Sequence, residues 1–486
     1  MNLSHLLAGF YSVSLPEIII SHLALDSRLV QPGSLFFALT GTHLDGCQFI
    51  DEAVQKGAHA ILTENKELAV QWHDKVPIIS VPDLRVHTGE LAAKFYDYPA
   101  KKMQMIGVTG TSGKTSCTQF IAALLHDLNI SCGVIGTLGN GLYGSIQAGN
   151  LTTPDAITLQ KTLAEFFQSG AKMTAMEVSS HSLDQGRVSG MEFDIGIFTN
   201  LTRDHLDYHH TMAAYGAAKK RLFDQTKHAI VNADDAFGRD ILRSFKGRKN
   251  VLAYSSDITF RKETHAQIYA DPLQFTHSGI KAHLITPWGK TELESSLVGQ
   301  FNLNNLLAVI AALCLLEIPL SAVIESIRQL RAVAGRMQSL GGDKKPLVVV
   351  DYAHKPDALE KVLVALRQQC QGKLYCVFGC GGDRDRGKRP MMAKIAEQYA
   401  DQVIVTDDNP RHENPAQIVT DILQGFTDAS RVIVQHDRSK AIYDSIRFAE
   451  MGDCVLIAGK GAETYQQIGD EKFPFNDVDK VRDALR

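Results

Sequence analysis

The chain has 486 residues, which is enough for two to four domains that each bury a core. Apolar residues make up 44% of it and charged residues 21%, and the net charge of −4 gives no electrostatic argument for nucleic acid or a membrane surface as a partner. Eight cysteines in a chain of this length do not make a disulfide framework, so we expect reduced thiols in the cytoplasm and no membrane insertion.

Residues 1–98 are predicted to form a small α/β domain without a phosphate loop. Strands are predicted at residues 35–39, 60–62 and 76–79, with helices between them, for example at 50–56. Polar segments at residues 26–28 and 40–46 follow predicted strand ends, and such segments are by themselves more often turns than ligand sites. A linker is predicted at residues 96–102.

The next segment, residues 99–331, opens with a phosphate-loop pattern at residues 105–116, where a short apolar strand runs into a Gly-rich turn and a helix. Consecutive backbone N–H groups in such a turn, with the positive end of the helix behind them, bind phosphate oxygens. The first glycine of the usual pattern is replaced by Val108, and a Gly-rich turn with a chance Lys-Thr pair is the alternative. We predict an ATP site formed by Gly110, Thr111, Ser112, Gly113, Lys114, Thr115 and Ser116.

The rest of this segment alternates between strands and helices, which implies a parallel sheet covered on both faces. The predicted strands are at residues 103–108, 133–136, 173–178, 195–199 and 229–231. Residues 250–298 differ, because their strands are predicted to be shorter, more polar and alternating, as in a small antiparallel insertion or sheet edge. The apolar run at residues 306–316 is too short to span a bilayer and favours a buried helix.

Several polar residues of this segment are candidates for metal or phosphate binding. Glu177 follows a buried strand beside the phosphate loop, which suits Mg²⁺, although a helix-capping carboxylate is the alternative. His205 and His209 are one helical turn apart, but no glutamate lies between them as in zinc proteases, so we prefer His205 as a contact to Mg²⁺ or phosphate. Lys219 would by default be an exposed helix lysine, and Asn302 could equally cap a helix.

Residues 332–486 contain four apolar strand candidates that each run into a polar cluster. The strands are at residues 347–350, 374–378, 403–405 and 455–457, and the clusters at 351–354, 381–385, 407–411 and 459–463. In an open α/β sheet, ligands bind at the carboxyl ends of the strands. Four clusters at such ends therefore predict a binding edge.

In this order, these motifs resemble the Mur ligase family, the ATP-dependent amino-acid ligases that build the peptidoglycan stem peptide. The resemblance covers almost the whole chain and rests on residues 109–115, 177–180, 199–207, 302, 335–336 and 351–354. Within the family, the chain is most similar to ligases that extend UDP-N-acetylmuramoyl-L-alanyl-D-glutamate. The resemblance implies an α/β protein of three domains: residues 1–98 for the uridine nucleotide, a central P-loop-type ATPase with a mostly parallel sheet at 99–331, and a C-terminal Rossmann-like domain for the amino acid at 332–486.

The resemblance also implies residue roles. The UDP-muramoyl-dipeptide would contact Leu25, Ser27, Thr42, His43, Leu44, Asn150, Thr152, Thr153, Ser179, Gln185 and Arg187. The adenosine part of ATP would contact Asn302, Arg336 and Asp351. The catalytic group would be Lys114, Glu177, His205 and Lys219, with Mg²⁺ on Thr115 and Glu177 and a second Mg²⁺ on His205 and Lys219. Lys219 matches a lysine that becomes N-carboxylated in this family, and a carbamate supplies anionic oxygens where an ammonium would repel Mg²⁺.

The third substrate is indicated by residues 408–411. Lysine-adding relatives generally lack Arg411, whose guanidinium can bind the extra carboxylate of meso-diaminopimelate in a bidentate manner. The matching contacts of the family are Arg384, Asp408, Asn409, Pro410, Gly459 and Glu463, and Glu463 can take the distal ammonium.

The reaction expected from the resemblance is ligation through an acyl phosphate by a monomer that acts on small molecules. Three alternatives remain: an L-lysine-adding ligase of the same type, a ligase like folylpolyglutamate synthase, and an ATP-binding regulatory module or kinase.

Overall fold

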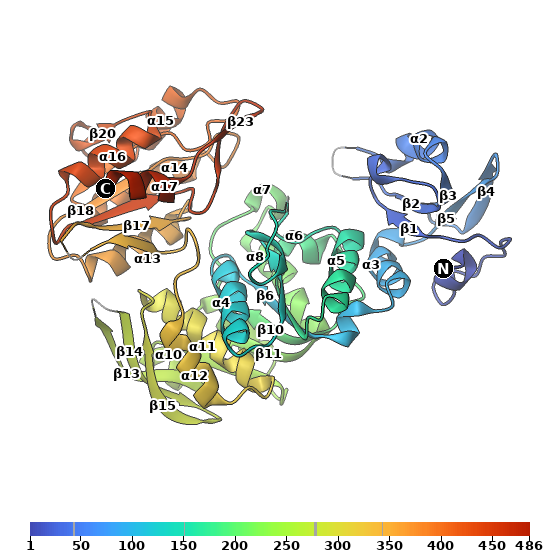
Figure 1. Ribbon diagram of the computed structural model, residues 1–486, viewed down its shortest axis with the longest axis horizontal. Helices are drawn as coiled ribbons and strands as arrows, with labels where there is room; N and C mark the ends of the chain where they lie inside the picture. Colours follow the sequence, from blue (N-terminus) through green and yellow to red (C-terminus); the bar gives the residue numbers. More distant parts are fainter. Residues whose placement is uncertain (42–43, 150, 277–278, 343) are drawn as a thin grey trace.

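The computed structural model describes residues 1–41, 44–149, 151–276, 279–342 and 344–486 (Figure 1). Three large sheets of five, ten and six strands follow one another along the described chain, and a small hairpin sheet lies near its end. Figure 1 shows the central part of the chain between the N-terminal part and the C-terminal part. The predicted α/β class is therefore confirmed, and the arrangement is that of a three-domain protein.

The N-terminal sheet has the strand order β1-β2-β3-β5-β4, and only the edge strand β4 is antiparallel to its neighbour. The predicted strands correspond to β2, β3 and β5, and β1 and β4 are additional. The strands are β1 (His22–Ala24), β2 (Ser34–Ala38), β3 (Ala58–Glu64), β4 (Ala69–His73) and β5 (Val76–Val81), and the helices are α1 (Leu3–Leu7), α2 (Ile50–Gln55) and α3 (Leu84–Phe95). A short 3₁₀ turn, Pro99–Lys102, leads into the central sheet.

The central sheet has a parallel body in the order β12-β11-β10-β6-β9-β7, and every strand predicted from residues 103–231 takes part in it. Because β6 pairs with both β10 and β9, the carboxyl ends of these three strands meet at the phosphate loop. The strands are β6 (Gln104–Thr109), β7 (Cys132–Gly136), β9 (Met173–Glu177), β10 (Phe193–Phe198), β11 (Thr226–Asn232) and β12 (Val251–Ser255).

Both edges of this sheet carry antiparallel strands. On one side, β13 (Ile268–Thr276), β14 (Gly279–Thr286) and β15 (Gly289–Ser295) form a meander, and on the other β8 (Gly139–Leu142) pairs with β7. The predicted antiparallel edge is confirmed. The expectation of shorter strands is wrong, since these three have 9, 8 and 7 residues whereas β6 has 6. The meander joins the parallel body through β13, which pairs with β12, and its strands are longest where they pair with each other in antiparallel register.

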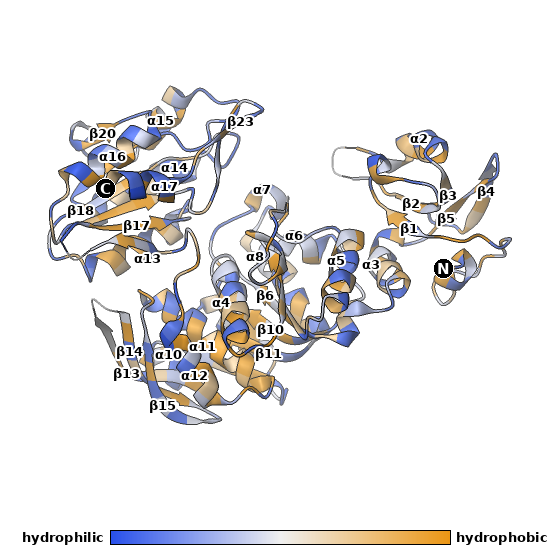
Figure 2. Cartoon of the chain, in the orientation of Figure 1, coloured by the Kyte–Doolittle hydropathy of each residue, from blue (hydrophilic) through white to orange (hydrophobic). Residues whose placement is uncertain are grey.

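Helices cover the central sheet on both faces. Helix α4 (Lys114–Asp127) and helix α11 (Gln300–Leu315) pack in one core with Val108, Ile195 and Ile197, whereas α5 (Ala156–Gln168) packs in a second core with Met105 and Met176. The predicted buried helix at 306–316 is confirmed as the body of α11, and Figure 2 shows orange, hydrophobic ribbon in this part of the chain around β10 and β11. Among the described residues, no helix has both the length and the apolar character needed to cross a bilayer. The other helices are α6 (Ser180–Asp184), α7 (Leu206–His209), α8 (Met212–Lys220), α9 (Ala236–Ser244), α10 (Ile258–Thr264) and α12 (Leu320–Gln329).

The C-terminal sheet has the order β16-β17-β21-β18-β19-β20, and only β16 is antiparallel. The four predicted strands are the adjacent parallel strands β17, β21, β18 and β19, so the four polar clusters come to one edge, as expected. The strands are β16 (Gln338–Gly341), β17 (Leu347–Asp351), β18 (Leu374–Phe378), β19 (Gln402–Val405), β20 (Ile433–Val434) and β21 (Cys454–Ala458), with a hairpin of β22 (Tyr465–Ile468) and β23 (Glu471–Pro474). Helices α13 (Pro356–Arg367), α14 (Lys388–Tyr399) and α15 (Pro415–Leu423) cover one face, and α16 (Arg438–Phe448) and α17 (Asp477–Ala484) the other.

Candidate active site

The phosphate loop connects β6 to α4 and needs glycine at two points. Gly110 and Gly113 have φ values of 145° and 86°, and a Cβ on Gly110 would lie 1.9 Å from the Oγ1 of Thr199. The carboxyl end of β10 holds the loop, because Thr199 Oγ1 donates to Ser112 O at 2.6 Å and Asn200 Oδ1 accepts from Ser112 N at 2.9 Å. The loop is therefore a fixed turn whose amides precede α4.

Lys114 lies over this turn. Its Nζ donates to Gly110 O at 2.7 Å and to Thr111 O at 3.0 Å, and burial lowers the pKa of Lys114 to about 8. Thr111, Thr115 and Ser116 of the predicted set are buried. The predicted ATP-phosphate residues thus form one continuous group at the start of a helix.

Thr115 and Glu177 are brought into direct contact. Thr115 Oγ1 donates to Glu177 Oε1 at 2.9 Å, and the same carboxylate, only 1% exposed, accepts from Thr137 N at 2.8 Å. The helix-cap alternative for Glu177 does not hold, since Ser179 caps α6. Among the described residues, no three or more His, Cys, Asp or Glu side chains gather in a metal-binding cluster. A cation beside Thr115 and Glu177 would need phosphate or water oxygens to complete its shell, which is the usual manner of Mg²⁺.

Lys219 is buried, not exposed. It is 1% exposed, its Nζ donates to Gly110 O at 2.8 Å, and the ammonium lies 4.5 Å from the centre of the Tyr215 ring. Burial lowers the pKa of Lys219 well below its usual value, and the nearby Lys114 and Lys355 add to this shift. The default expectation of a solvated helix lysine is therefore wrong.

His205 also lies near Tyr215, in a group of aromatic rings that includes His181. Its ring centre is 6.0 Å from that of Tyr215 and 4.8 Å from that of His181. Its Nε2 is 3.0 Å from Asp204 Oδ2. Burial and the neighbouring His205 and His209 lower the pKa of His181 to about 4, so His181 is neutral at pH 7. Lys219 and His205, the two residues that were predicted to share a second cation, thus both lie near the Tyr215 ring.

Two residues of the C-terminal part contact the central part at this site. Arg336 Nη2 lies 3.4 Å from Thr115 Oγ1, and its guanidinium is 4.3 Å from the centre of the Tyr352 ring. Lys355 Nζ pairs with Asp204 Oδ2 at 2.5 Å. No role was predicted for Lys355 from the sequence, although it directly follows the polar cluster at 351–354.

The other predicted adenosine contacts are Asp351 and Asn302. Asp351 Oδ2 accepts from Met337 N at 2.7 Å, and burial raises the pKa of Asp351. Asn302 is 4% exposed in the first turn of α11 and donates to Val298 O at 2.8 Å. Its side chain therefore also hydrogen bonds to the backbone of the protein. Asn305, one turn further on, lies next to Gly113.

The residues predicted to hold the muramoyl-dipeptide form a network next to Glu177. Thr153 Oγ1 donates to Glu177 O at 2.8 Å and accepts from Ser179 N at 3.2 Å. Arg187 donates to Thr153 O at 2.9 Å and to Gln185 Oε1 at 2.6 Å. Thr152 joins through Thr137, with their hydroxyl oxygens 3.2 Å apart. Asn150 lies outside the described residues.

The described residues predicted for the UDP end lie in the N-terminal part, outside its strands. Ser27 donates to Glu52 at 2.9 Å, Leu25 is half-buried, and Leu44 is exposed. Thr42 and His43 lie outside the described residues. The structure does not bring this group to the phosphate loop.

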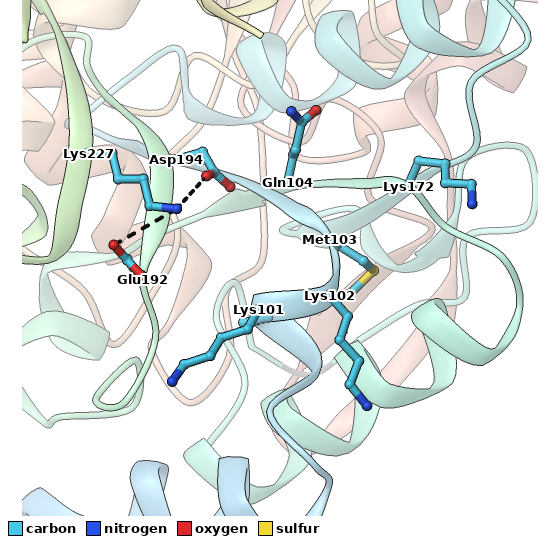
Figure 3. A pocket seen from close by; sticks show the side chains of 9 residues that line it. Lys101, Lys102, Met103, Gln104, Lys172, Glu192, Asp194 and Lys227 are labelled. Atoms are coloured by element: carbon cyan, nitrogen blue, oxygen red, sulfur yellow. Dashed lines mark hydrogen bonds and ion pairs between the residues drawn. The ribbon is translucent and has the colours of Figure 1, made fainter.

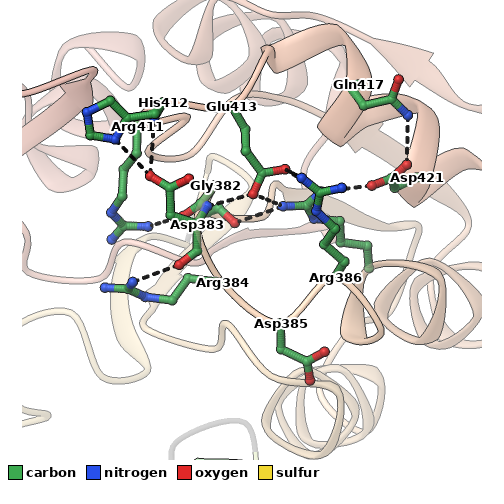
Figure 4. Close-up of polar contacts among 12 residues, drawn as sticks. Gly382, Asp383, Arg384, Asp385, Arg386, Arg411, His412, Glu413, Gln417 and Asp421 are labelled. Atoms are coloured by element: carbon green, nitrogen blue, oxygen red, sulfur yellow. Dashed lines mark hydrogen bonds and ion pairs between the residues drawn. The ribbon is translucent and has the colours of Figure 1, made fainter. Parts of the chain in front are cut away.

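The C-terminal group surrounds the start of the segment that follows β18. A Cβ on Gly381 would lie 2.8 Å from Arg411 Nη1 and 3.9 Å from Arg384 Cγ, and Figure 4 shows both guanidinium groups on the same side of the loop. Asn409 Nδ2 donates to Glu463 Oε2 at 2.9 Å. Two arginines, an amide and a carboxylate around one loop can bind both ends of a charged amino acid.

Other members of this group are buried beneath it. A Cβ on Gly459 would lie 2.6 Å from Asp408 Oδ2, and the carbonyl of Pro410 packs against Gly382. Lys460, fully buried, donates to Asn409 at 2.8 Å and to Glu463 at 2.9 Å. Lys460 was not predicted, because a lysine within a Gly-rich cluster gives no sign that it is buried.

A separate depression of about 460 Å³ lies at the opposite end of the central sheet (Figure 3). Lys227 pairs there with Asp194 at 3.0 Å and with Glu192 at 3.9 Å, and Lys101, Lys102 and Lys172 line it as well. It contains none of the predicted site residues and lies at the amino ends of the strands, whereas the phosphate loop lies at their carboxyl ends.

Three family profiles match the chain. They are the Mur ligase middle domain at residues 108–313, the Mur ligase glutamate ligase domain at residues 335–461, and the Mur ligase family catalytic domain at residues 19–96.

Curated relatives and solved structures agree with these profiles. UDP-N-acetylmuramoyl-L-alanyl-D-glutamate–2,6-diaminopimelate ligase of Coxiella burnetii is 48% identical over 99% of both chains, and the ligase of the same name from Haemophilus influenzae is 44% identical over 97% of both. A solved structure with this name is 36% identical, covers 100% of this chain and 98% of its own, and has a TM-score of 0.72. MurF from Thermotoga maritima, solved with ADP, is 19% identical with a TM-score of 0.63 over 97% of this chain and 98% of its own, which shows the fold alone.

Proposed function

Because the chain belongs to the Mur ligase family, we propose that it joins meso-diaminopimelate to the D-glutamyl carboxylate of UDP-N-acetylmuramoyl-L-alanyl-D-glutamate, with hydrolysis of ATP. The product is a UDP-N-acetylmuramoyl tripeptide for peptidoglycan synthesis. The enzyme is a cytoplasmic monomer whose partners are these small molecules. The observation that carries the choice of amino acid is that the side chains of Arg384 and Arg411 meet at Gly381, with their guanidinium groups on the same side of the loop (Figure 4).

The reaction needs activation of a carboxylate, because oxide is a poor leaving group. The γ-phosphoryl group of ATP passes to a D-glutamyl carboxylate oxygen, and ADP leaves. The amine of diaminopimelate attacks the acyl carbon, a tetrahedral intermediate forms and loses a proton, and phosphate departs with the oxygen. Phosphoryl transfer depends mainly on position and charge neutralisation, which Lys114 and the loop amides supply.

Mg²⁺ would supply further positive charge at the phosphates, held by Thr115 and Glu177, with a second ion held by His205 and a carbamate on Lys219. The carbamate forms when the Lys219 nitrogen adds to CO₂ and loses a proton. The pair Thr115–Glu177, 2.9 Å apart and buried at the loop, fits the first ion. Lys219 is buried at Gly110 with a backbone carbonyl as partner, and a carbamate would change this cation into an anion within the site.

The substrates are assigned to the groups of residues described above. The network of Thr152, Thr153, Ser179, Gln185 and Arg187 would bind the muramoyl-dipeptide next to Glu177. Leu25, Ser27 and Leu44 would bind the UDP end, and Arg336, Asp351 and Asn302 the adenosine. Glu463 and Asn409 would bind one amino-acid head of diaminopimelate while Arg384 and Arg411 bind the carboxylate of the other.

The first test is phosphate release from ATP with Mg²⁺ and the UDP-dipeptide, compared between meso-diaminopimelate, L-lysine and no amino acid. Release only with diaminopimelate, matched by the tripeptide product in mass spectrometry, is expected. Phosphate release with lysine instead would agree with a ligase activity but contradict the role of Arg384 and Arg411 in selecting diaminopimelate. Release that does not depend on the UDP-dipeptide would overturn the ligase itself.

A further inference from the structure

Beneath the loop that carries Arg384 is a network of buried charge in which none of the residues was assigned a role above. We propose that Arg389 and Glu413 are positioning residues: they hold the segment 381–386 and thereby place Arg384 and Arg411 for the distal carboxylate of the amino acid. This inference rests on the proposed function and extends it to the origin of the preference for a diamino dicarboxylate.

Arg389 lies in the first turn of α14 and is fully buried. Its Nη1 donates to Glu413 Oε2 at 3.0 Å and to Asp421 Oδ2 at 2.8 Å, and its Nη2 donates to Glu413 Oε1 at 2.9 Å and to Gly381 O at 3.4 Å. Two carboxylates and a carbonyl hold the buried guanidinium of Arg389 in one orientation. Loss of a partner would leave part of its charge without a hydrogen-bond acceptor where little water is present.

Glu413 connects Arg389 to the backbone of the segment 381–386. Its Oε1 accepts from Asp383 N at 2.6 Å, as drawn in Figure 4. The hydrogen bond from Arg389 lowers the pKa of Glu413, so the acceptor stays charged at neutral pH. Asp383 has φ of 53°, a left-handed conformation that is strained for aspartate, and a fixed acceptor for its N–H compensates for that strain.

Both arginines hydrogen bond to the backbone that Glu413 holds. Arg411 Nη1 donates to Gly382 O at 2.7 Å, and Arg384 Nη1 donates to Asp383 O at 2.9 Å. The loop passes close to its neighbour at Gly382, where a Cβ would lie 1.9 Å from Pro410 O. Loss of the acceptor at Glu413 therefore moves the carbonyls that orient the two guanidinium groups.

Asp421 provides a matched control on the same arginine. It lies on α15, accepts from Arg389 through Oδ2 and from Gln417 through Oδ1, and has no hydrogen bond to segment 381–386 among those of the described residues. Glu413→Gln removes the charge and places an amide NH₂ where one oxygen was. In one orientation of the amide this NH₂ faces Arg389 Nη1, and in the other it faces both Arg389 Nη2 and Asp383 N, so the two-oxygen pair with Arg389 that holds the side chain is lost. Asp421→Asn removes the same charge from Arg389 but leaves the loop contact intact.

The experiment is steady-state kinetics of the full-length enzyme with diaminopimelate and with L-lysine, together with the thermal midpoint of each variant. Glu413→Gln is expected to raise KM for diaminopimelate about tenfold, to leave KM for ATP within about twofold, and to lower the diaminopimelate-to-lysine ratio of kcat/KM. Asp421→Asn is expected to keep that ratio. Glu413→Asp, which keeps the charge but withdraws it from Asp383 N, serves if the glutamine variant does not fold, and the same loss of preference is expected.

An unchanged ratio in a folded Glu413 variant, or an equal loss of the ratio in Asp421→Asn, would overturn the positioning role and leave a structural one. Absence of diaminopimelate-dependent turnover in the unmodified enzyme would instead overturn the proposed function, so the two failures are distinguishable.

Discussion

Lys219 occupies a position in which a lysine side chain has little water and a carbonyl oxygen as its partner. Its Nζ is held 2.8 Å from Gly110 O, within the turn that binds phosphate. A positive charge could serve phosphate directly, whereas a carbamate would serve it through Mg²⁺. The two roles respond differently to added carboxylate, because only the second one needs an anion at this point.

For Lys219→Ala we expect a loss of activity of about 100-fold or more, partly restored by formate or acetate, since a small carboxylate can replace the carbamate oxygens. The measurement is phosphate release with and without the added acid. Lys220→Ala on the same helix is the control, since Lys220 is only half-buried and lies over the Phe245 ring, and it should stay near full activity. Full activity of the unsupplemented Lys219 variant would contradict the carbamate.

Arg411 is strained in its backbone as well as charged, with φ of 51°. For Arg411→Ala we expect KM for diaminopimelate to rise about 10- to 100-fold, the effect of losing a charge-assisted hydrogen-bond pair, while KM for ATP changes little. Initial rates over a range of diaminopimelate concentrations measure this. Arg431→Ala, an exposed arginine of the same part of the chain, should have ordinary kinetics. Unchanged diaminopimelate kinetics in the Arg411 variant would remove the basis of the assigned specificity.

At the scale of elements, helices α16 and α17 are joined by a fully buried ion pair. Arg438 donates to both carboxylate oxygens of Asp477, at 2.8 and 2.7 Å, and both side chains are 0% exposed. Such a pair costs desolvation when it forms, but removal of one partner costs more, because the other charge stays buried and unpaired. The pair therefore specifies how the two helices meet on one face of the C-terminal sheet.

For Asp477→Asn we expect a loss of about 3–5 kcal/mol in the free energy of unfolding of this part. Asp479→Asn, two residues further along α17 at an exposed position, removes a solvated pair with Arg482 and should cost at most about 1 kcal/mol. Urea denaturation followed by circular dichroism compares the two midpoints. Equal midpoints would mean that the buried pair adds nothing beyond a surface one.

At the scale of the whole molecule, the residues proposed for one reaction lie on three separate sheets. The phosphate loop and Glu177 are central, the diaminopimelate group is C-terminal, and the UDP group is N-terminal (Figure 1). Contacts such as Arg336–Thr115 and Lys355–Asp204 already cross from the C-terminal part to the central one. We therefore expect a conformational step on the reaction path, with hinges near residues 98–99 and 334–335.

Small-angle X-ray scattering tests this step. The radius of gyration is expected to fall when a non-hydrolysable ATP analogue and the UDP-dipeptide are added together, because substrate contacts then join the three parts. Each ligand added alone is the control and should cause less compaction. An unchanged radius with both ligands bound at saturation would contradict closure.

The sequence by itself determined the fold class, most strands and the phosphate loop, because these depend on local patterns. Apolar runs of strand length that lead into polar or Gly-containing segments predicted β6, β9, β17, β18, β19 and β21 within one or two residues, and the resemblance in motifs indicated the family. Strands β1, β4 and β20 escaped prediction since they are short or exposed, so their pairing depends on the neighbouring strand more than on their own residues.

Only the tertiary structure decided which side chains meet and which are buried. Glu177 and Thr115 are 62 positions apart, and Lys219 is 109 positions from Gly110, yet each pair is in contact because parallel strands carry their ends to one edge. The burial of Lys219, Arg389 and Lys460 depends on elements distant in the chain, so a charged residue on a helix or in a loop gave no sign of it. Local patterns thus predicted the elements, whereas long-range packing set the burial and the electrostatics of their side chains.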